Sequence, residues 1–177
     1  RIYYYLEIKN NINWEEVANH KFIARLGLTP GSVEVNVALS SVSAEAAKLA
    51  INTHSMTEMM SESSGYWNKN LSKIAVNGDL KDAKLFYSLL YRTMQSPYVI
   101  SDQDGQYRNT KGEVQKDKQI RYNGWAIWDN YRTQLPLLSI ITPDRYAGMV
   151  TSIADLYLSG KKDYAGQKEP SNTVRSE

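Results

Sequence analysis

The amino-acid sequence predicts a chain of mixed class, in which β-strands come first and α-helices follow. Two segments, residues 3–8 and 33–39, alternate apolar and polar side chains with the period of two that half-buried strands show. From about residue 43 onward the apolar residues recur at spacings of three and four, which is typical of amphipathic helices. This change of period places the boundary between a β part and a helical part near residue 43.

Local signals predict where the first elements begin and end. The Pro-Gly pair in residues 29–31 predicts a turn between the two strands. Ser43 stands where a hydroxyl can cap a helix, and Glu45 follows in the first turn, where the helix dipole favours a negative charge. The first helix is therefore expected to begin directly after Ser43.

A second amphipathic helix is predicted over residues 56–74, broken by the Ser-Glu-Ser-Ser-Gly run at 61–65. Its methionines are interpreted as core residues, since Met fills irregular gaps in protein interiors. A third helix is expected to start from Asp79 as N-cap and to run to about Met94, before Pro97.

The segment from residue 98 to 122 is polar and rich in turn residues, so it is predicted to be a loop or a small hairpin between two helices. Long irregular connections in compact domains are usually functional or disordered, and the aromatic and charged content of this one favours an ordered, functional segment. Within it, Asp117 is predicted to lie in a Lys-rich, solvated turn.

Two further helices are expected after this connection. Residues 128–141 have helical spacing, with a kink or a new start near Pro136. Thr142 as N-cap and Pro143 at the first helical position predict a helix that runs to Ser159. The tail 161–177 is polar and nonperiodic.

The most informative stretch runs from Tyr122 to Arg132 and brings two indoles, a carboxylate and a guanidinium into eight residues. Aromatic faces pack on the C–H faces of sugar rings, and Asp and Arg side chains can hydrogen-bond sugar hydroxyls. The residues concerned are Trp125, Trp128, Asp129 and Arg132. They predict a carbohydrate site, and the alternative from residue types alone is a buried Trp pair beside a structural Asp–Arg ion pair.

Three motifs in this region resemble glycoside hydrolase family 92, the calcium-dependent exo-acting α-mannosidases. They are Ser-Asp-x-Asp-Gly-x-Tyr-Arg at 101–108, a Lys/Gly/Val-containing hairpin at 111–114, and Trp-Asp-x-Tyr-Arg-x-x-x-Pro-Leu at 128–137. Weaker similarity is found at 33–47, where the family's strand enters a helix, and at 85–92, which resembles its first barrel helix. The resemblance covers roughly residues 3–160.

The resemblance implies a β-sandwich domain followed by an (α/α)6 barrel, and this chain is then a piece of the whole. Residues 1–42 would be the C-terminal part of the β-sandwich, 43–78 a helical linker, 79–160 the first part of the catalytic barrel and 161–177 a polar tail. The partner of this piece would be the missing remainder of its own two domains. A periplasmic or secreted location is also implied by the resemblance alone.

The resemblance further implies an inverting mechanism on terminal α-linked mannose, with calcium as cofactor. Family members carry the catalytic carboxylates and most calcium contacts beyond the part that this chain covers, so the segment alone is expected to be inactive. By its position in the motif, Asp129 would hydrogen-bond the terminal mannose, with Trp128 and Arg132 shaping the pocket. Asp102, Asp104 and Tyr107 are candidates for the rim of the pocket or for holding the loop.

Composition argues against several other classes. The net charge of +2 comes from 21 basic and 19 acidic residues without a basic cluster, which disfavours nucleic-acid binding. No apolar run approaches the roughly 20 residues that span a bilayer. The chain has no cysteine and two histidines in unrelated segments, so thiolate metal sites and Ser–His–Asp catalysis lack parts. The Asp-x-Asp-Gly run resembles part of a calcium loop, but the bidentate Glu is absent, and no metal ligands are predicted within the chain.

Two alternative functions stay open at this point. One is a carbohydrate-binding protein without catalytic activity, which the presence or absence of two inward carboxylates beyond residue 177 would decide. The other is a different (α/α)6 glycosidase, such as an α-glucosidase or trehalase relative, which a panel of aryl α-mannosides and α-glucosides would distinguish.

Overall fold

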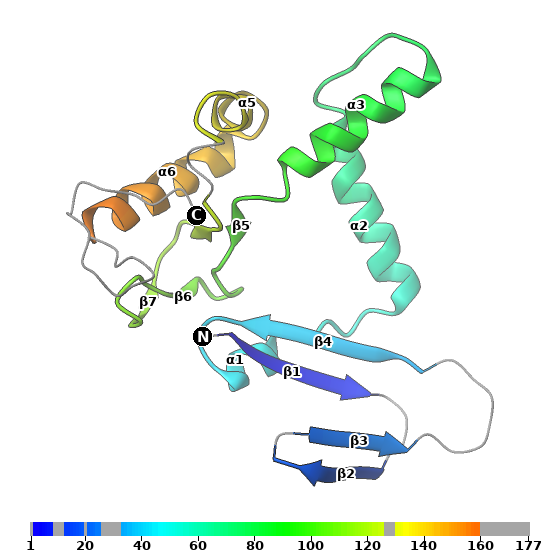
Figure 1. The fold of residues 1–177 in the computed structure, drawn as a ribbon, viewed down its shortest axis with the longest axis vertical. Helices are drawn as coiled ribbons and strands as arrows, with labels where there is room; N and C mark the ends of the chain where they lie inside the picture. The colour runs from blue at the N-terminus through cyan, green and yellow to red at the C-terminus, as the bar shows by residue number, and fades with distance from the viewer. Residues whose placement is uncertain (1, 9–12, 20, 26–32, 126–129, 160–177) are drawn as a thin grey trace. The chain divides into compact units, whose positions relative to one another are not determined.

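The computed structural model describes residues 2–8, 13–19, 21–25, 33–125 and 130–159. The chain divides into two compact units, residues 1–52 and 53–177, coloured blue to cyan and cyan to orange in Figure 1. The first unit is mostly β and the second mostly α, so the predicted order of β then α is confirmed. Within the described ranges, no helix is both long and apolar enough to cross a membrane.

The first unit contains two antiparallel strand pairs and one short helix. Strand β1 (Tyr3–Ile8) pairs with β4 (Val35–Ser40), and β2 (Asn13–Ala18) pairs with β3 (Lys21–Arg25). Helix α1 (Ala44–Leu49) follows, and the Ser43 side chain accepts a hydrogen bond from the Ala46 amide. The two predicted strands and the Ser43 cap are thus confirmed. The β2–β3 hairpin was not predicted, and the predicted turn at 29–31 lies outside the described residues.

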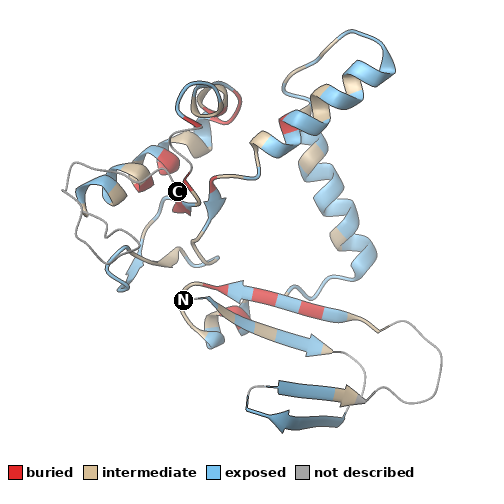
Figure 2. Ribbon diagram, viewed as in Figure 1, coloured by how far each residue is buried: buried red, intermediate tan, exposed pale blue. Residues whose placement is uncertain are grey.

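The β1–β4 pair buries one face and exposes the other, as the alternating colours of β4 in Figure 2 show. Helix α1 contacts both strands, with Ala47 fully buried and the Lys48 ammonium 5.6 Å from the centre of the Tyr5 ring. The opposite face carries exposed apolar side chains: Tyr4, Leu6, Val35, Val37 and Leu39. This pair of strands therefore has an apolar face that nothing in the described part of its unit covers.

The second unit consists of helices joined by short strand pairs. Among the residues that the structure describes, its helices are α2 (Met56–Leu71), α3 (Leu80–Thr93), α5 (Gln134–Ile141) and α6 (Pro143–Leu158). Between α3 and α5 lie β5 (Tyr98–Val99), β6 (Gln106–Arg108), β7 (Val114–Lys116) and β8 (Tyr122–Asn123).

Helix α2 differs from its prediction, because it runs without a break through residues 61–65. It begins at a capping box in which Ser55 and Glu58 satisfy each other's backbone amides, so its start is well defined. Gly65 within it costs about 1 kcal/mol relative to Ala but does not interrupt the hydrogen bonds of a helix. The expectation that its methionines are core residues is wrong for Met56 and Met60, which are exposed.

The other helices follow their sequence signals closely. Asp79 caps α3 through the Asp82 amide, and α3 ends before Pro97, as predicted. Of the predicted helix 128–141, residues 131–133 form a turn and α5 starts anew at Gln134, which puts Pro136 in the first turn, where its missing amide hydrogen costs no intrahelical bond. Helix α6 starts at Pro143 as predicted.

The cap predicted at Thr142 is not present. The Thr142 hydroxyl donates to the Leu138 carbonyl at 2.8 Å, so it serves the end of α5 and not the start of α6. The side chain of Thr142, which lies between α5 and α6, is therefore hydrogen-bonded to the preceding helix.

One apolar core holds the second unit together. Its buried members come from α3, β8 and the residues after it, α5 and α6: Leu90, Tyr122, Trp125, Leu138, Ile141 and Met149. Because Tyr122 and Trp125 belong to this cluster, the predicted functional stretch begins inside the core of the unit.

Candidate sugar-binding site

Two strand pairs build the segment from residue 98 to residue 123. Strand β5 pairs with β8, with Tyr98 opposite Asn123 and Val99 opposite Tyr122, so the two ends of this segment meet. Strand β6 pairs with β7 to form a hairpin farther out. The predicted small hairpin is therefore confirmed, and the pairing of β5 with β8 joins the two ends of the segment that contains it.

Gly105 fixes the turn that leads into the hairpin. Its φ of +83° is in the left-handed region, and an added Cβ would lie 2.4 Å from the backbone oxygen of Asp117. Its carbonyl accepts a hydrogen bond from the Asp117 amide at 3.0 Å, and its amide donates to Asp102. The Asp-Gly pair thus closes the turn and ties it to the far end of the hairpin.

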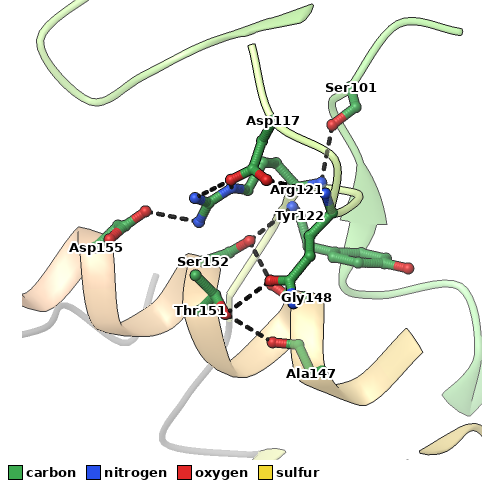
Figure 3. A network of polar contacts seen from close by, with 10 residues as sticks. Ser101, Asp117, Arg121, Tyr122, Ala147, Gly148, Thr151, Ser152 and Asp155 are labelled. Carbon is green, nitrogen blue, oxygen red and sulfur yellow. Dashed lines mark hydrogen bonds and ion pairs between the residues drawn. The ribbon is translucent and has the colours of Figure 1, made fainter. Parts of the chain in front are cut away.

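Helix α6 packs against strand β8 and is hydrogen-bonded to it (Figure 3). The Tyr122 amide donates to the Ser152 hydroxyl at 3.0 Å, and that hydroxyl donates to the Gly148 carbonyl at 2.7 Å. A Cβ on Gly148 would lie 2.4 Å from the backbone oxygen of Ile120, so only glycine permits this approach. The backbone of β8 is therefore bonded directly to the helix.

Arg121 is the centre of the polar contacts in Figure 3. Its Nε and Nη2 donate to Oδ2 of Asp117 at 3.0 and 2.5 Å, and its Nη1 donates to Oδ2 of Asp155 at 2.6 Å. Its guanidinium carbon lies 5.3 Å from the centre of the Tyr107 ring, and its amide donates to Ser101. The buried side chain of Arg121 thus joins the hairpin to α6, and its backbone amide adds the start of the connection.

The pKa values in this cluster follow from the contacts. A hydrogen bond from the Gln119 amide, and then those from Arg121, hold the pKa of Asp117 below its ordinary value of 3.8. Burial acts to lower the pKa of Arg121, but the hydrogen bond to Asp117 and the charges around it raise it overall. Asp117 is ionised and Arg121 charged at neutral pH. The Asp117 side chain is 29% exposed, in keeping with the expected solvated turn, but its carboxylate is also held by the buried guanidinium of Arg121, which was not predicted.

A cavity of about 240 Å³ lies beside this cluster. Tyr107, Trp125, Arg121 and Asn123 contribute to its wall, together with Asp155 of α6. It combines aromatic rings with amide and charged groups, which is the mixture that sugar-binding sites use.

The structure brings two of the predicted site residues together. Tyr107 and Trp125 line the same cavity although 18 positions separate them in the sequence. Trp125 is only 3% exposed and is also part of the core, so its ring supports the wall of the cavity from within.

The two predicted aspartates of the 101–108 motif lie at the turn. Both carboxylate oxygens of Asp104 accept hydrogen bonds from Gln106, which lower the pKa of Asp104. The Asp102 amide donates to the Gln106 carbonyl at 2.8 Å. Neither residue lines the cavity, and the Asp104 carboxylate is occupied by its hydrogen bonds from Gln106 within the turn.

The remaining predicted residues are not brought to the cavity by the described part of the chain. Arg132 is exposed, and its Nε donates to the Tyr131 hydroxyl at 2.6 Å. Trp128 and Asp129 lie outside the described residues, so their role stays a prediction.

The sequence did not single out Arg121 or Asp155. Asp155 stands 34 positions after Arg121, and no local pattern links an arginine before a strand to an aspartate late in a helix. The spacing of four between Asp117 and Arg121 was the one available signal, and outside a helix such spacing has no fixed meaning.

The described residues do not provide a metal site. No group of three or more His, Cys, Asp or Glu side chains among them is placed to hold a metal ion. The predicted calcium remains a prediction about the whole protein.

Comparison with known proteins defines the class. A model of the glycosyl hydrolase family 92 catalytic domain matches residues 42–172. Three solved structures share the fold. An α-mannosidase of family GH92 from Bacteroides thetaiotaomicron is 19% identical with a TM-score of 0.78 over 88% of this chain and 25% of its own. The glycosyl hydrolase ccman5, also of family GH92, is 22% identical with a TM-score of 0.79 over 96% of this chain and 26% of its own.

The third is a family GH92 inverting mannosidase from Bacteroides thetaiotaomicron, which is 19% identical with a TM-score of 0.77 over 96% of this chain and 26% of its own. The chain thus spans about a quarter of the length of these structures. A search among curated proteins found no match. The chain is part of a glycosyl hydrolase catalytic region. It belongs to glycosyl hydrolase family 92, as its motifs predicted.

Proposed function

We propose that this chain is part of an inverting exo-α-mannosidase that removes terminal α-linked mannose from glycans, and that this segment supplies residues that bind the sugar. The observation that carries the proposal is the match of the family catalytic domain to residues 42–172. Similar solved structures are described as mannosidases, one as an inverting mannosidase and one as an α-mannosidase in complex with mannoimidazole.

The geometry supports a binding role for this segment more than an acid–base role. An inverting glycosidase needs a protonated carboxyl and a carboxylate about 6.5–9.5 Å apart. The two carboxylates beside the cavity, Asp117 and Asp155, both accept hydrogen bonds from Arg121. The pKa of Asp117 is lowered, whereas a general acid needs a raised one. We therefore infer that the catalytic pair lies elsewhere in the whole enzyme and that this segment alone is inactive.

The architecture proposed for the whole protein is a β-sandwich followed by an (α/α)6 barrel. The apolar face of the β1–β4 pair supports the sandwich, since a second sheet packed on that face would bury it. The exposed leucines of α3, which are Leu80, Leu85 and Leu89, support a barrel in which further helices cover them. The proposed domain limits are those predicted from the sequence.

Calcium and the location of the enzyme are proposed on the family resemblance alone. We propose that the calcium ligands lie in the rest of the protein. A periplasmic or secreted location is proposed on the same basis.

The activity is tested on the full-length protein with aryl α-mannosides and aryl α-glucosides. We expect hydrolysis of the mannoside, with β-mannose as the first product seen by proton NMR, because inversion reverses the anomeric configuration. Preference for the glucoside would favour another glycosidase activity. Binding of mannosides without any release of mannose would favour the carbohydrate-binding alternative.

The sugar-binding role is tested most directly at Asp129. Asp129→Ala in the full-length enzyme is expected to lower kcat/KM about ten- to a hundred-fold, as loss of a charged hydrogen bond from a water-excluded pocket does. Asp82, an exposed carboxylate in the first turn of α3, provides the control, and Asp82→Ala should leave kcat/KM near normal. If Asp129 is the structural partner of Arg132, Asp129→Ala will instead lower the melting temperature at unchanged kcat/KM per folded molecule.

A further inference from the structure

We propose that a second cavity in the helical unit binds a small organic ligand that carries an oxyanion, either a carboxylate or a phosphate. The cavity measures about 400 Å³, which is within the range of small-molecule sites. Tyr66 and Trp67 of α2, Tyr98 of β5 and Arg145 of α6 contribute to its wall. Tyr122 separates it from the cavity beside Arg121, since it lines both.

The first observation is a buried hydroxyl without a partner. Tyr122 is 4% exposed, and its hydroxyl has no hydrogen-bond partner among the residues that the structure describes. Leaving such a group unsatisfied costs about 1–3 kcal/mol. Arg145 and Tyr66, whose charges act on this hydroxyl, both line the second cavity and do not line the first. Tyr122 itself lines this second cavity, so its side chain forms part of the wall to which Arg145 and Tyr66 also contribute.

The second observation is an arginine without a carboxylate. The guanidinium carbon of Arg145 lies 5.3 Å from the centre of the Tyr66 ring, which holds the side chain over an aromatic face. No ion pair is found for Arg145 in the described part of the chain, and no Asp or Glu lines the cavity. The cavity therefore has an excess positive charge.

The polar groups around the cavity favour a ligand that accepts hydrogen bonds. The Asn70 amide, the Ser96 hydroxyl and the Thr142 hydroxyl already donate to backbone carbonyls. The unpartnered Tyr122 hydroxyl and the guanidinium of Arg145 remain as donors, together with the side chains of Tyr66, Trp67, Gln95 and Tyr98. Burial raises the pKa of Tyr122, so its hydroxyl keeps its proton at neutral pH and can donate. An oxyanion can accept from Tyr122 and Arg145, whereas a neutral polyol would find no carboxylate to accept from its own hydroxyls.

The remaining residues of the wall indicate which chemical groups the ligand carries besides its oxyanion. Apolar side chains complete the lining: Met94, Val99, Leu138 and Met149. Tyr66 and Tyr98 are exposed at the surface, so the cavity opens to solvent. A compact apolar or aromatic group that carries one oxyanion matches this wall.

Isothermal titration of the full-length protein with benzoate, phenyl phosphate and benzyl alcohol tests the proposal. These probes share a ring and differ in the attached group. We expect at least one of the two anions to bind and benzyl alcohol to bind at least ten-fold more weakly. The anion that binds more tightly shows whether the oxyanion of the ligand is a carboxylate or a phosphate. Absence of binding by both anions, or equal binding of all three probes, would overturn the proposal. Binding is measured without turnover, so the result does not depend on mannosidase activity.

Variants locate the binding. Arg145→Gln and Tyr122→Phe are each expected to weaken the preferred anion about ten- to a hundred-fold, while Arg92→Gln, at an exposed arginine of α3 outside the cavity, leaves the affinity unchanged. Without ligand, Tyr122→Phe should keep or raise the melting temperature, because it removes only an unpartnered hydroxyl. A lower melting temperature for Tyr122→Phe, or equal weakening by Arg92→Gln, would show that these groups do not form the site.

Discussion

Helices α2 and α6 are each 16 residues long and each contains an interior glycine, but they stand in different surroundings. Helix α2 has no buried residue, and nothing lies within 4 Å of a Cβ placed on Gly65. Helix α6 buries Gly148, Met149 and Ser152 against the strand that carries Arg121 and Tyr122. Glycine, methionine and serine therefore contribute to packing in α6, whereas in α2 the same residue types affect only the intrinsic stability of the helix.

A matched pair of methionines should show the largest difference. Met149 is 5% exposed and Met60 is 66% exposed. Met149→Ala should lower the free energy of unfolding by about 2–5 kcal/mol, because it removes buried apolar atoms and leaves a cavity. Met60→Ala should change it by less than about 0.5 kcal/mol. Urea unfolding of both variants measures this, and equal losses would mean that α2 is packed in the intact protein.

Serine to alanine substitutions should give the next largest difference. Ser152→Ala leaves the buried amide of Tyr122 without its acceptor and is expected to cost about 1–3 kcal/mol. Ser64 is exposed in α2, where alanine has the higher helix propensity, so Ser64→Ala should stabilise by a few tenths of a kcal/mol. Thermal unfolding distinguishes the two directions, and an unchanged melting temperature for Ser152→Ala would contradict the role given to its hydroxyl.

The two glycines should respond with opposite signs. Gly65→Ala should stabilise by about 0.5–1 kcal/mol, since alanine favours helix and the site is open. Gly148→Ala should destabilise by about 1–2 kcal/mol net, because the clash with the Ile120 backbone exceeds the gain in helix propensity. Stabilisation by both substitutions would mean that β8 can move away from α6 at little cost.

The smallest expected effect concerns pH. The pKa of Asp117 is lower in the folded protein than its ordinary value of 3.8, so its contribution to stability is present above that value and is lost as pH falls through the lowered pKa. Asp117→Asn should therefore reduce the acid sensitivity of the unit below about pH 4, whereas Asp82→Asn in α3 should not. Unfolding midpoints between about pH 2 and 6 would measure this, and parallel curves for Asp117→Asn and the unaltered protein would exclude the contribution.

The parts of the fold that depend on neighbouring residues could be predicted from the sequence. Ser43 and Asp79 cap their helices through amides three positions away, and the Asp-Gly pair at 104–105 closes its turn within four residues. The break expected in α2 was wrong because serine and glycine are weak helix breakers, and the capping box at Ser55 outweighs them.

The parts that depend on distant residues could not be predicted. Arg121 takes its position from a hairpin residue and from Asp155, and its importance arises only when the connection lies on α6. Tyr107 and Trp125 were selected for their chemistry, and the strand pairing that places both at one cavity has no local signature. The family resemblance identified the region but not the residue at the centre of its contacts.

Because β5 pairs with β8, the segment between these strands begins and ends at the same place beside the helices of the second unit. Beyond this strand pair, Asn109 and Thr110 at the tip of the β6–β7 hairpin form part of the wall of the cavity beside Arg121. Insertions or deletions at the tip can therefore rebuild this wall while the strand pair keeps Trp125 in the core. A change in the length of this hairpin would therefore alter the shape of the cavity without a change in the helices that support it.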